Sequence, residues 1–63
     1  MFFIEHRKGR SPLKRETTAA SSVAAALVTA KQHAHEIGAD TIVILSRAGR
    51  VAGVFSTYSS NID

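Results

Sequence analysis

Residues 22–38 read SVAAALVTAKQHAHEIG, and their apolar side chains recur at intervals of four, three, four and three. That spacing lines them up on one face of an α-helix. The side chains concerned are Val23, Leu27, Ala30, Ala34 and Ile37. Ser21 or Ser22 can cap the first turn, and Gly38 can supply the left-handed stop. The pattern predicts an alanine-rich helix over residues 22–37 whose apolar face is made mostly of small side chains.

The segment after this helix predicts a β-hairpin. Residues 41–46 read TIVILS, a short and nearly continuous apolar run typical of a strand buried on both faces, either central in a sheet or at a dimer edge. Residues 47–50 then form a turn signal in which Gly49 takes a positive φ, and residues 51–57 return as a strand. Gly53 inside that strand indicates a bulge or a close backbone approach.

The segment before the helix predicts a second hairpin. Residues 2–6 are rich in strand-forming side chains, a turn follows at Lys8 and Gly9, and residues 13–18 alternate in the manner of a strand. Pro12 suits an edge strand, although Ser11 and Pro12 could instead open a helix. We therefore expect residues 1–63 to form one α+β domain of order ββαββ, the alternative being βαββ with a three-stranded sheet.

Three segments resemble a family of small bacterial and phage domains of unknown function, the one numbered 2188. The first family pattern, W-x-V-K-R-E-G with A-S, is approached here by Leu13, Lys14, Arg15, Glu16, Ala20 and Ser21. The second, A-I-x-x-A-R-x-x-A-K, is approached by Ala26, Leu27, Ala30, Lys31, Ala34, His35 and Gly38. The third, V-V-I-H-G-x-D-G-R-I, is approached by Ile42, Val43, Ile44, Gly49, Arg50 and Val51. The likeness covers about residues 3 to 52. Ser11, Thr17 and Ala48 depart from it, standing where the family has tryptophan, glycine and aspartate. The resemblance implies the ββαββ fold and no function.

Size and composition limit how this chain is stabilised and where it acts. Sixty-three residues supply only a thin core, and the absence of cysteine excludes disulfides, so we expect a homodimer. His33 and His35 are two apart on the predicted helix and cannot share a metal ion, and we expect no metal and no cofactor. The longest apolar run, residues 23–28, is too short for a membrane span, and no signal-peptide pattern is present. These features predict a cytoplasmic protein.

A cluster of positive charge is the strongest functional feature of the sequence. Five of the eight basic residues fall within nine positions, two more flank the second turn, and the net charge is +3. These cations are Arg7, Lys8, Arg10, Lys14, Arg15, Arg47 and Arg50. Clustered cations at hairpin tips favour contacts with the phosphates of a nucleic acid, although a solvated loop that keeps the protein in solution is the alternative. Phe2, Phe3 and Phe55 are assigned to the core rather than to base stacking.

No catalytic constellation is evident, so the sequence predicts a binding module and not an enzyme. The serines lack a nucleophile-elbow context, the glycines fit no phosphate loop, and no carboxylate has a partner at catalytic spacing. His33, at the edge of the apolar helix face, is assigned a structural role. The alternative function is protein binding through a sheet edge or through a strip of the helix outside its apolar face, formed by Ala24, Ala25 and Val28.

Overall fold

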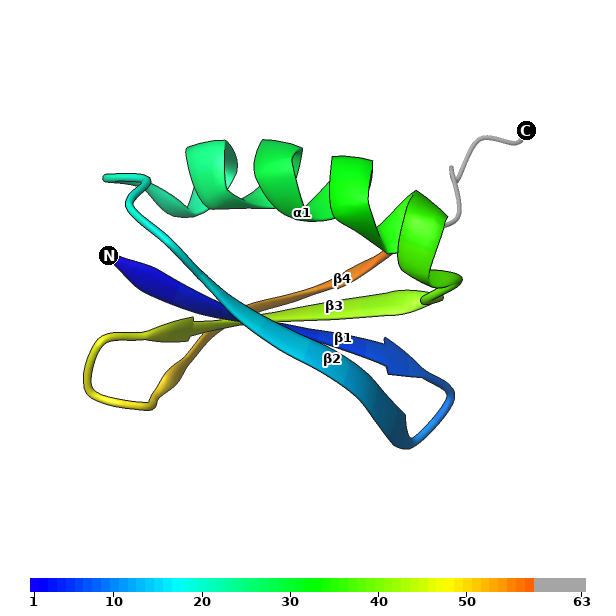
Figure 1. Ribbon diagram of the computed structural model, residues 1–63. Helices are drawn as coiled ribbons and strands as arrows, with labels where there is room; N and C mark the ends of the chain where they lie inside the picture. The colour runs from blue at the N-terminus through cyan, green and yellow to red at the C-terminus, as the bar shows by residue number, and fades with distance from the viewer. Residues whose placement is uncertain (58–63) are drawn as a thin grey trace.

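A computed structural model describes residues 1–57 and places one helix across one face of a four-stranded antiparallel sheet (Figure 1). The elements, in chain order, are β1 (Phe2–Lys8), β2 (Ser11–Thr18), α1 (Val23–Ile37), β3 (Thr41–Ser46) and β4 (Val51–Ser56). The α+β class and the ββαββ order are confirmed, and the βαββ alternative is wrong because residues 11–18 form a strand. No helix within residues 1–57 has the length and apolar character needed to cross a membrane.

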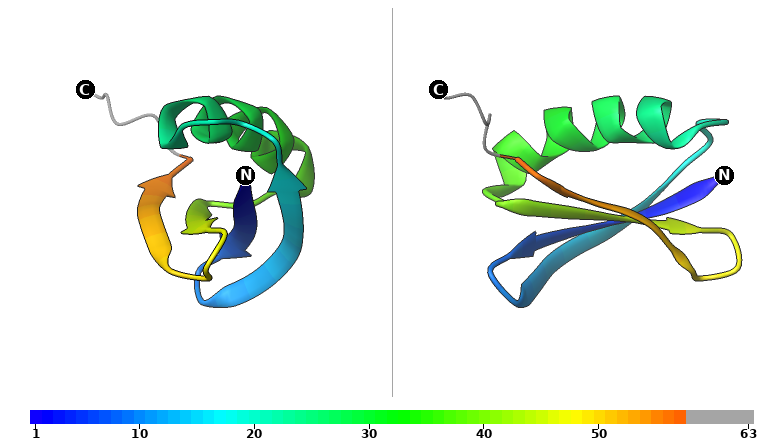
Figure 2. Two further views of the ribbon diagram at one scale, coloured as in Figure 1. Left: turned by 90° about the vertical axis from the view of Figure 1, so that its left-hand side faces the viewer. Right: turned by 180° about the vertical axis from the view of Figure 1, so that it is seen from behind.

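The strand order is β2-β1-β3-β4, so β1 and β3 are central and β2 and β4 are edges. Pro12 lies in the edge strand β2, as expected. An edge strand is paired on one side only, so a residue without a backbone N–H can be placed there without loss of a hydrogen bond between strands. β1 and β3 run antiparallel, with Phe2 opposite Ser46 and Arg7 opposite Thr41. The β1–β2 turn and the β3–β4 turn therefore lie at opposite ends of the sheet, as Figure 1 and both views of Figure 2 show.

The ends of α1 follow the predicted capping chemistry. Ser22 is the N-cap, and its hydroxyl accepts a hydrogen bond from the backbone N–H of Ala25 at 3.2 Å. Gly38 ends the helix at φ 83°, and its N–H donates to the carbonyl of Ala34 at 2.9 Å. A left-handed residue at this position costs glycine no clash with a Cβ, which is why the helix stops there.

The core lies between α1 and the central strands. Ile4, Ile42 and Ile44 are fully buried and face a helix surface made of alanine. That surface consists of Ala26, Ala30 and Ala34. Because alanine adds little bulk, the helix backbone can approach the sheet closely, and the isoleucines supply most of the buried volume. The larger side chains of the predicted stripe lie at its margins and are only partly buried: Val23, Leu27 and Ile37.

The second hairpin contains both features predicted for Gly49 and Gly53. Gly49 has φ 86°, and the register between β3 and β4 shifts after Ile44, so that Ala52 is the extra residue of a bulge. A Cβ on Gly53 would lie 2.6 Å from the ring of Phe55, which packs against the core. Glycine at 53 therefore leaves room for the Phe55 ring to cover the edge of the core.

Candidate functional site

The two faces of the sheet are separated by strand alternation. On β1, Phe2, Ile4 and His6 face α1, whereas Phe3 and Glu5 face away from it. The face turned away from the helix, here called the open face, has no element packed on it within residues 1–57 (Figure 2). Candidate binding residues on that face are therefore accessible, and those under the helix are not.

Glu5 engages two of the five cations clustered in the first hairpin. Its carboxylate accepts a hydrogen bond from Nη2 of Arg15 at 3.1 Å, and its Oε1 lies 3.2 Å from Nε of Arg7 in an ion pair without hydrogen-bond geometry. Arg15 and Glu5 are opposite each other in the β1–β2 register, which explains their contact. Arg7 and Arg15 are therefore partly neutralised, and Arg7 is also half-buried.

The remaining three cations of the first hairpin are exposed, and no ion pair joins them to another residue of the described chain, 1–57. They are Lys8, Arg10 and Lys14. One carboxylate lies close to their turn: Asp40 accepts hydrogen bonds from the backbone N–H of Gly9 at 3.0 and 3.1 Å. Asp40 thus ties the β1–β2 turn to the connection between α1 and β3, and it reduces the positive potential of that turn.

Arg47 and Arg50 are exposed in the β3–β4 turn, at the opposite end of the sheet from Lys8 and Arg10. The sequence alone leaves open whether the two hairpin tips share one end of the sheet, and the antiparallel pairing of the central strands β1 and β3 places them at opposite ends. One cation of the first hairpin does approach the second turn. Arg15 and Arg47 line the same pocket on the open face.

This pocket, here called the Phe3 pocket, combines apolar and cationic side chains. Phe3 and Leu45 are opposite each other in the β1–β3 register and provide its apolar lining. The complete lining is Phe3, Arg15, Leu45, Arg47, Ala48 and Gly49. Phe2 and Phe55 pack against the core as predicted, but Phe3 does not, because alternation along β1 turns it to the open face.

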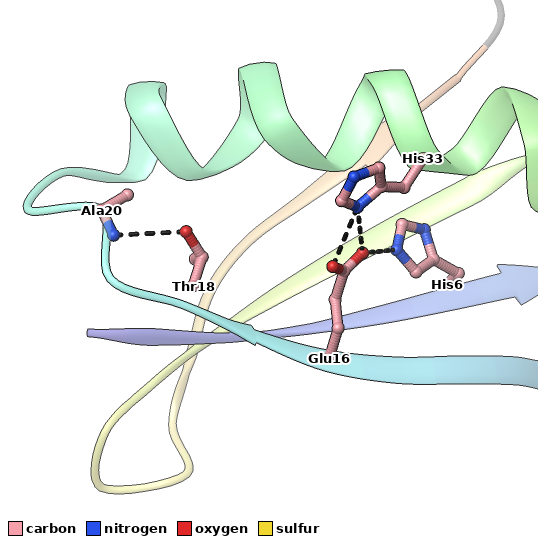
Figure 3. Close-up of polar contacts among 5 residues, drawn as sticks. All are labelled: His6, Glu16, Thr18, Ala20 and His33. Carbon is pink, nitrogen blue, oxygen red and sulfur yellow. Dashed lines mark hydrogen bonds and ion pairs between the residues drawn. The ribbon is translucent and has the colours of Figure 1, made fainter.

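Under the helix, Glu16 lies between two histidines, a group here called the histidine–carboxylate cluster: His6, Glu16 and His33 (Figure 3). Nε2 of His6 lies 2.6 Å from Oε2 of Glu16, and Nδ1 of His33 lies 2.9 Å from both carboxylate oxygens. An ionised carboxylate only accepts hydrogen bonds, so each contacting ring nitrogen carries a proton. The cluster joins β1, β2 and α1.

The electrostatics of Glu16 favour its ionised form. Burial alone would raise the pKa of Glu16, but hydrogen bonds from His6 and His33, together with their charge, outweigh burial and lower that pKa. His6 is fully buried, and its Nδ1 has no hydrogen-bond partner in residues 1–57. A solute cannot reach His6 while α1 is docked. The arrangement therefore suits a structural link between helix and sheet better than proton transfer to a substrate.

This cluster was not predicted from the sequence, in which no carboxylate, Glu16 included, has a partner at catalytic spacing along the chain. His6, Glu16 and His33 are separated by 10 and 17 positions along the chain, so only the fold brings them together. The structural role predicted for His33 agrees with its contact to Glu16. Within the described chain, no group of three or more potential ligands is arranged to hold a metal ion.

The outer surface of α1 carries the predicted interaction strip. Ala24, Ala25 and Val28 are all exposed, and Val28 is 60% accessible. The strip is on the opposite side of the helix from Ala26 and Ala30, which are fully buried. Its side chains are consequently available to a partner.

Comparison of the chain with protein-family models, with curated proteins and with solved structures finds no significant match. The resemblance to family 2188 therefore stays a prediction.

Proposed function

We propose that this protein is a non-catalytic module that binds nucleic acid, mainly by contacts between its cations and phosphate groups. The observation that carries the proposal is the set of exposed cations that have no ion pair within residues 1–57: Lys8, Arg10, Lys14, Arg47 and Arg50. Flexible cations of this kind bind phosphates without reading base sequence. The net charge of +3 agrees with an anionic partner, which such a protein would meet in the cytoplasm.

The separation of the two cationic turns favours a polymer over a small anion. β3 joins the two ends of the sheet and has six residues, so the turns are roughly 20 Å apart at about 3.3 Å per residue. A single phosphate cannot contact both turns, whereas the repeated phosphates of a nucleic acid can. Arg15, between the turns, adds a contact on the path across the open face.

Fluorescence anisotropy at low and high salt tests this function with mixed-sequence DNA and RNA. We expect binding at low salt that weakens as salt rises, because bound phosphates release their counterions. The double variant Lys8→Gln with Arg10→Gln removes two proposed phosphate contacts and should make the slope of log K against log salt shallower by about 1.4 to 1.8. Lys31→Gln is the matched control, since Lys31 is exposed on α1 and outside both turns.

Two results would contradict the function. One is the absence of binding at low salt, or binding that does not respond to salt. The other is a loss of affinity per removed charge in Lys31→Gln equal to that in the double variant, since that would make net charge, rather than the position of the cations, responsible for binding.

A second candidate function, protein binding or homodimer formation, is supported by the exposed strip of Ala24, Ala25 and Val28. Val28 is 60% accessible, and a domain this small has little core to stabilise it alone. Val28→Glu should weaken self-association or partner capture, with little effect on folding because the position is exposed. Unchanged sedimentation and unchanged pull-down of partners by this variant would exclude the helix strip as an interface.

A further inference from the structure

The Phe3 pocket is lined by one aromatic side chain and by two arginines. Phe3 and Leu45 are adjacent across the central strands, Arg15 is held diagonally to Phe3 by its bond to Glu5, and Arg47 comes from the β3–β4 turn. Arg15 is 65% exposed and uses one nitrogen for Glu5, so its other donors face solvent. The pocket therefore offers an aromatic surface and two cations to one ligand.

These two chemistries match one class of ligand. A nucleobase stacks on an aromatic side chain through its π-face, whatever its sequence, and guanidinium groups bind phosphate oxygens through paired donors. In a duplex the faces of the bases are hidden by their neighbours, so only an unstacked base can lie against Phe3. A simple phosphate would use the cations and leave the ring without a role.

We propose that the Phe3 pocket binds one unstacked nucleotide of a single-stranded nucleic acid, with its base against Phe3 and its adjoining phosphates at Arg15 and Arg47. This inference rests on the phosphate-binding function proposed above and narrows its ligand from nucleic acid in general to single strands. Glu5 holds one guanidinium nitrogen of Arg15 and offsets part of its charge. The helix is not involved, since it covers the other face of the sheet.

The test compares three ligands of equal phosphate number at low salt: a single strand of about 12 nucleotides, within the range of single-strand binding sites, an abasic strand of the same length, and the corresponding duplex. Wild-type protein should bind the single strand roughly 5- to 150-fold more tightly than the abasic strand, the contribution expected of one stacked base. DNA and RNA versions of the strand identify which backbone is preferred.

Phe3→Leu should remove most of that preference and leave the affinity for duplex unchanged, because it keeps an apolar side chain but loses the stacking surface. Phe2→Leu is the matched control: Phe2 is the neighbouring phenylalanine, but it packs against the core on the covered face. It should retain the preference for the single strand. Circular dichroism establishes that each variant is folded, and the abasic comparison on wild-type protein tests the proposal even if Phe3→Leu does not fold.

The outcomes separate this inference from the function on which it rests. Equal, salt-dependent affinity for the single strand, the abasic strand and the duplex would overturn the Phe3 pocket as a nucleotide site and leave phosphate binding intact. A full preference for the single strand in folded Phe3→Leu would also overturn it. Failure of all three ligands to bind at low salt would overturn both.

Discussion

Each face of the sheet holds one carboxylate between two basic side chains, and the two arrangements differ in what they connect. On the covered face, Glu16 accepts hydrogen bonds from His6 of β1 and His33 of α1, so it joins the helix layer to the sheet layer. On the open face, Glu5 contacts Arg7 and Arg15, which both belong to the sheet itself.

The difference shows how one kind of contact serves either stability or recognition according to where it lies. Under the helix, His6 is fully buried, so breaking its contact with Glu16 leaves a polar ring nitrogen without a partner and away from solvent, whereas His33 at the helix margin is partly exposed. On the open face, Arg15 is largely exposed and keeps donors directed to solvent, so breaking its contact with Glu5 releases a cation rather than stranding it, whereas Nε of Arg7 is buried. The effects of substitutions on the two faces should therefore differ both in the property that changes, stability or binding, and in the size of the change.

The largest contrast in stability should come from truncating one aliphatic side chain on each face. Ile44→Ala leaves a cavity beneath α1, where Ile44 is fully buried, and should lower the free energy of unfolding by about 2–5 kcal/mol. Val54→Ala removes a side chain that is 61% exposed and should change it by less than about 0.5 kcal/mol. Urea denaturation measures both, and equal losses would mean that the open face is covered in solution, as in a dimer.

Neutralising the two carboxylates should give the next largest contrast. Glu16→Gln replaces charge-assisted hydrogen bonds to both histidines and should cost about 1–3 kcal/mol of folding stability. Glu5→Gln should cost no more than about 1 kcal/mol, since Arg15 is exposed and Arg7 is only half-buried. Glu5→Gln should also tighten nucleic-acid binding, because Arg7 and Arg15 lose their counter-charge. Weaker binding by this variant would mean that Glu5 helps binding by holding Arg15 in place rather than opposing it by neutralising the arginines.

Acid titration of stability should distinguish the covered carboxylate further. The pKa of folded Glu16 lies below the ordinary value of 4.5, so its stabilising contribution is present above that pH and is lost as pH falls through the lowered pKa. The difference in unfolding free energy between wild type and Glu16→Gln should therefore shrink as pH is lowered from above 4.5 to below the folded pKa. A difference that does not vary with pH over this range would exclude ionised Glu16 as the stabilising form.

The smallest stability effect is expected away from both faces of the sheet. Val28→Glu alters the outer surface of α1 and should change the free energy of unfolding by less than about 0.5 kcal/mol. A larger loss at low protein concentration would not fit an exposed position. A loss that appears only at high concentration would identify the strip as a self-association surface, because stability linked to assembly rises with protein concentration.

Local sequence patterns predicted the elements of this fold well. Ser22 and Gly38 cap α1 as expected, Gly49 adopts the expected positive φ, and Pro12 occupies an edge strand. Each depends on chemistry within a few residues of the position itself. The predicted strand 13–18 proved to begin at Ser11, because the hairpin pairing with β1 extends it beyond the alternating segment.

The features that sequence reasoning did not find depend on strand order. Strand order decides that the cationic turns lie at opposite ends, that Arg15 and Arg47 share a pocket, and that Glu16 meets His33. None of these pairings has a local signal. Phe3 was misassigned to the core for a related reason: adjacent phenylalanines in a strand must face opposite sides, and the β1 pattern alone does not say that one side is open. The sequence leaves open whether Tyr58 packs in the core or stacks on a base, and it predicts a polar, fraying tail from there to Asp63; both lie outside the described residues.

The alanine surface of α1 has a consequence for finding relatives of this protein. Ala26, Ala30 and Ala34 recur every fourth residue at fully buried positions, where a larger side chain would push the helix off the isoleucines below. Selection can then vary the exposed positions freely while holding these three small. A homologue should therefore keep three small residues at this spacing of four, followed by a glycine, even where its overall sequence identity is too low to detect.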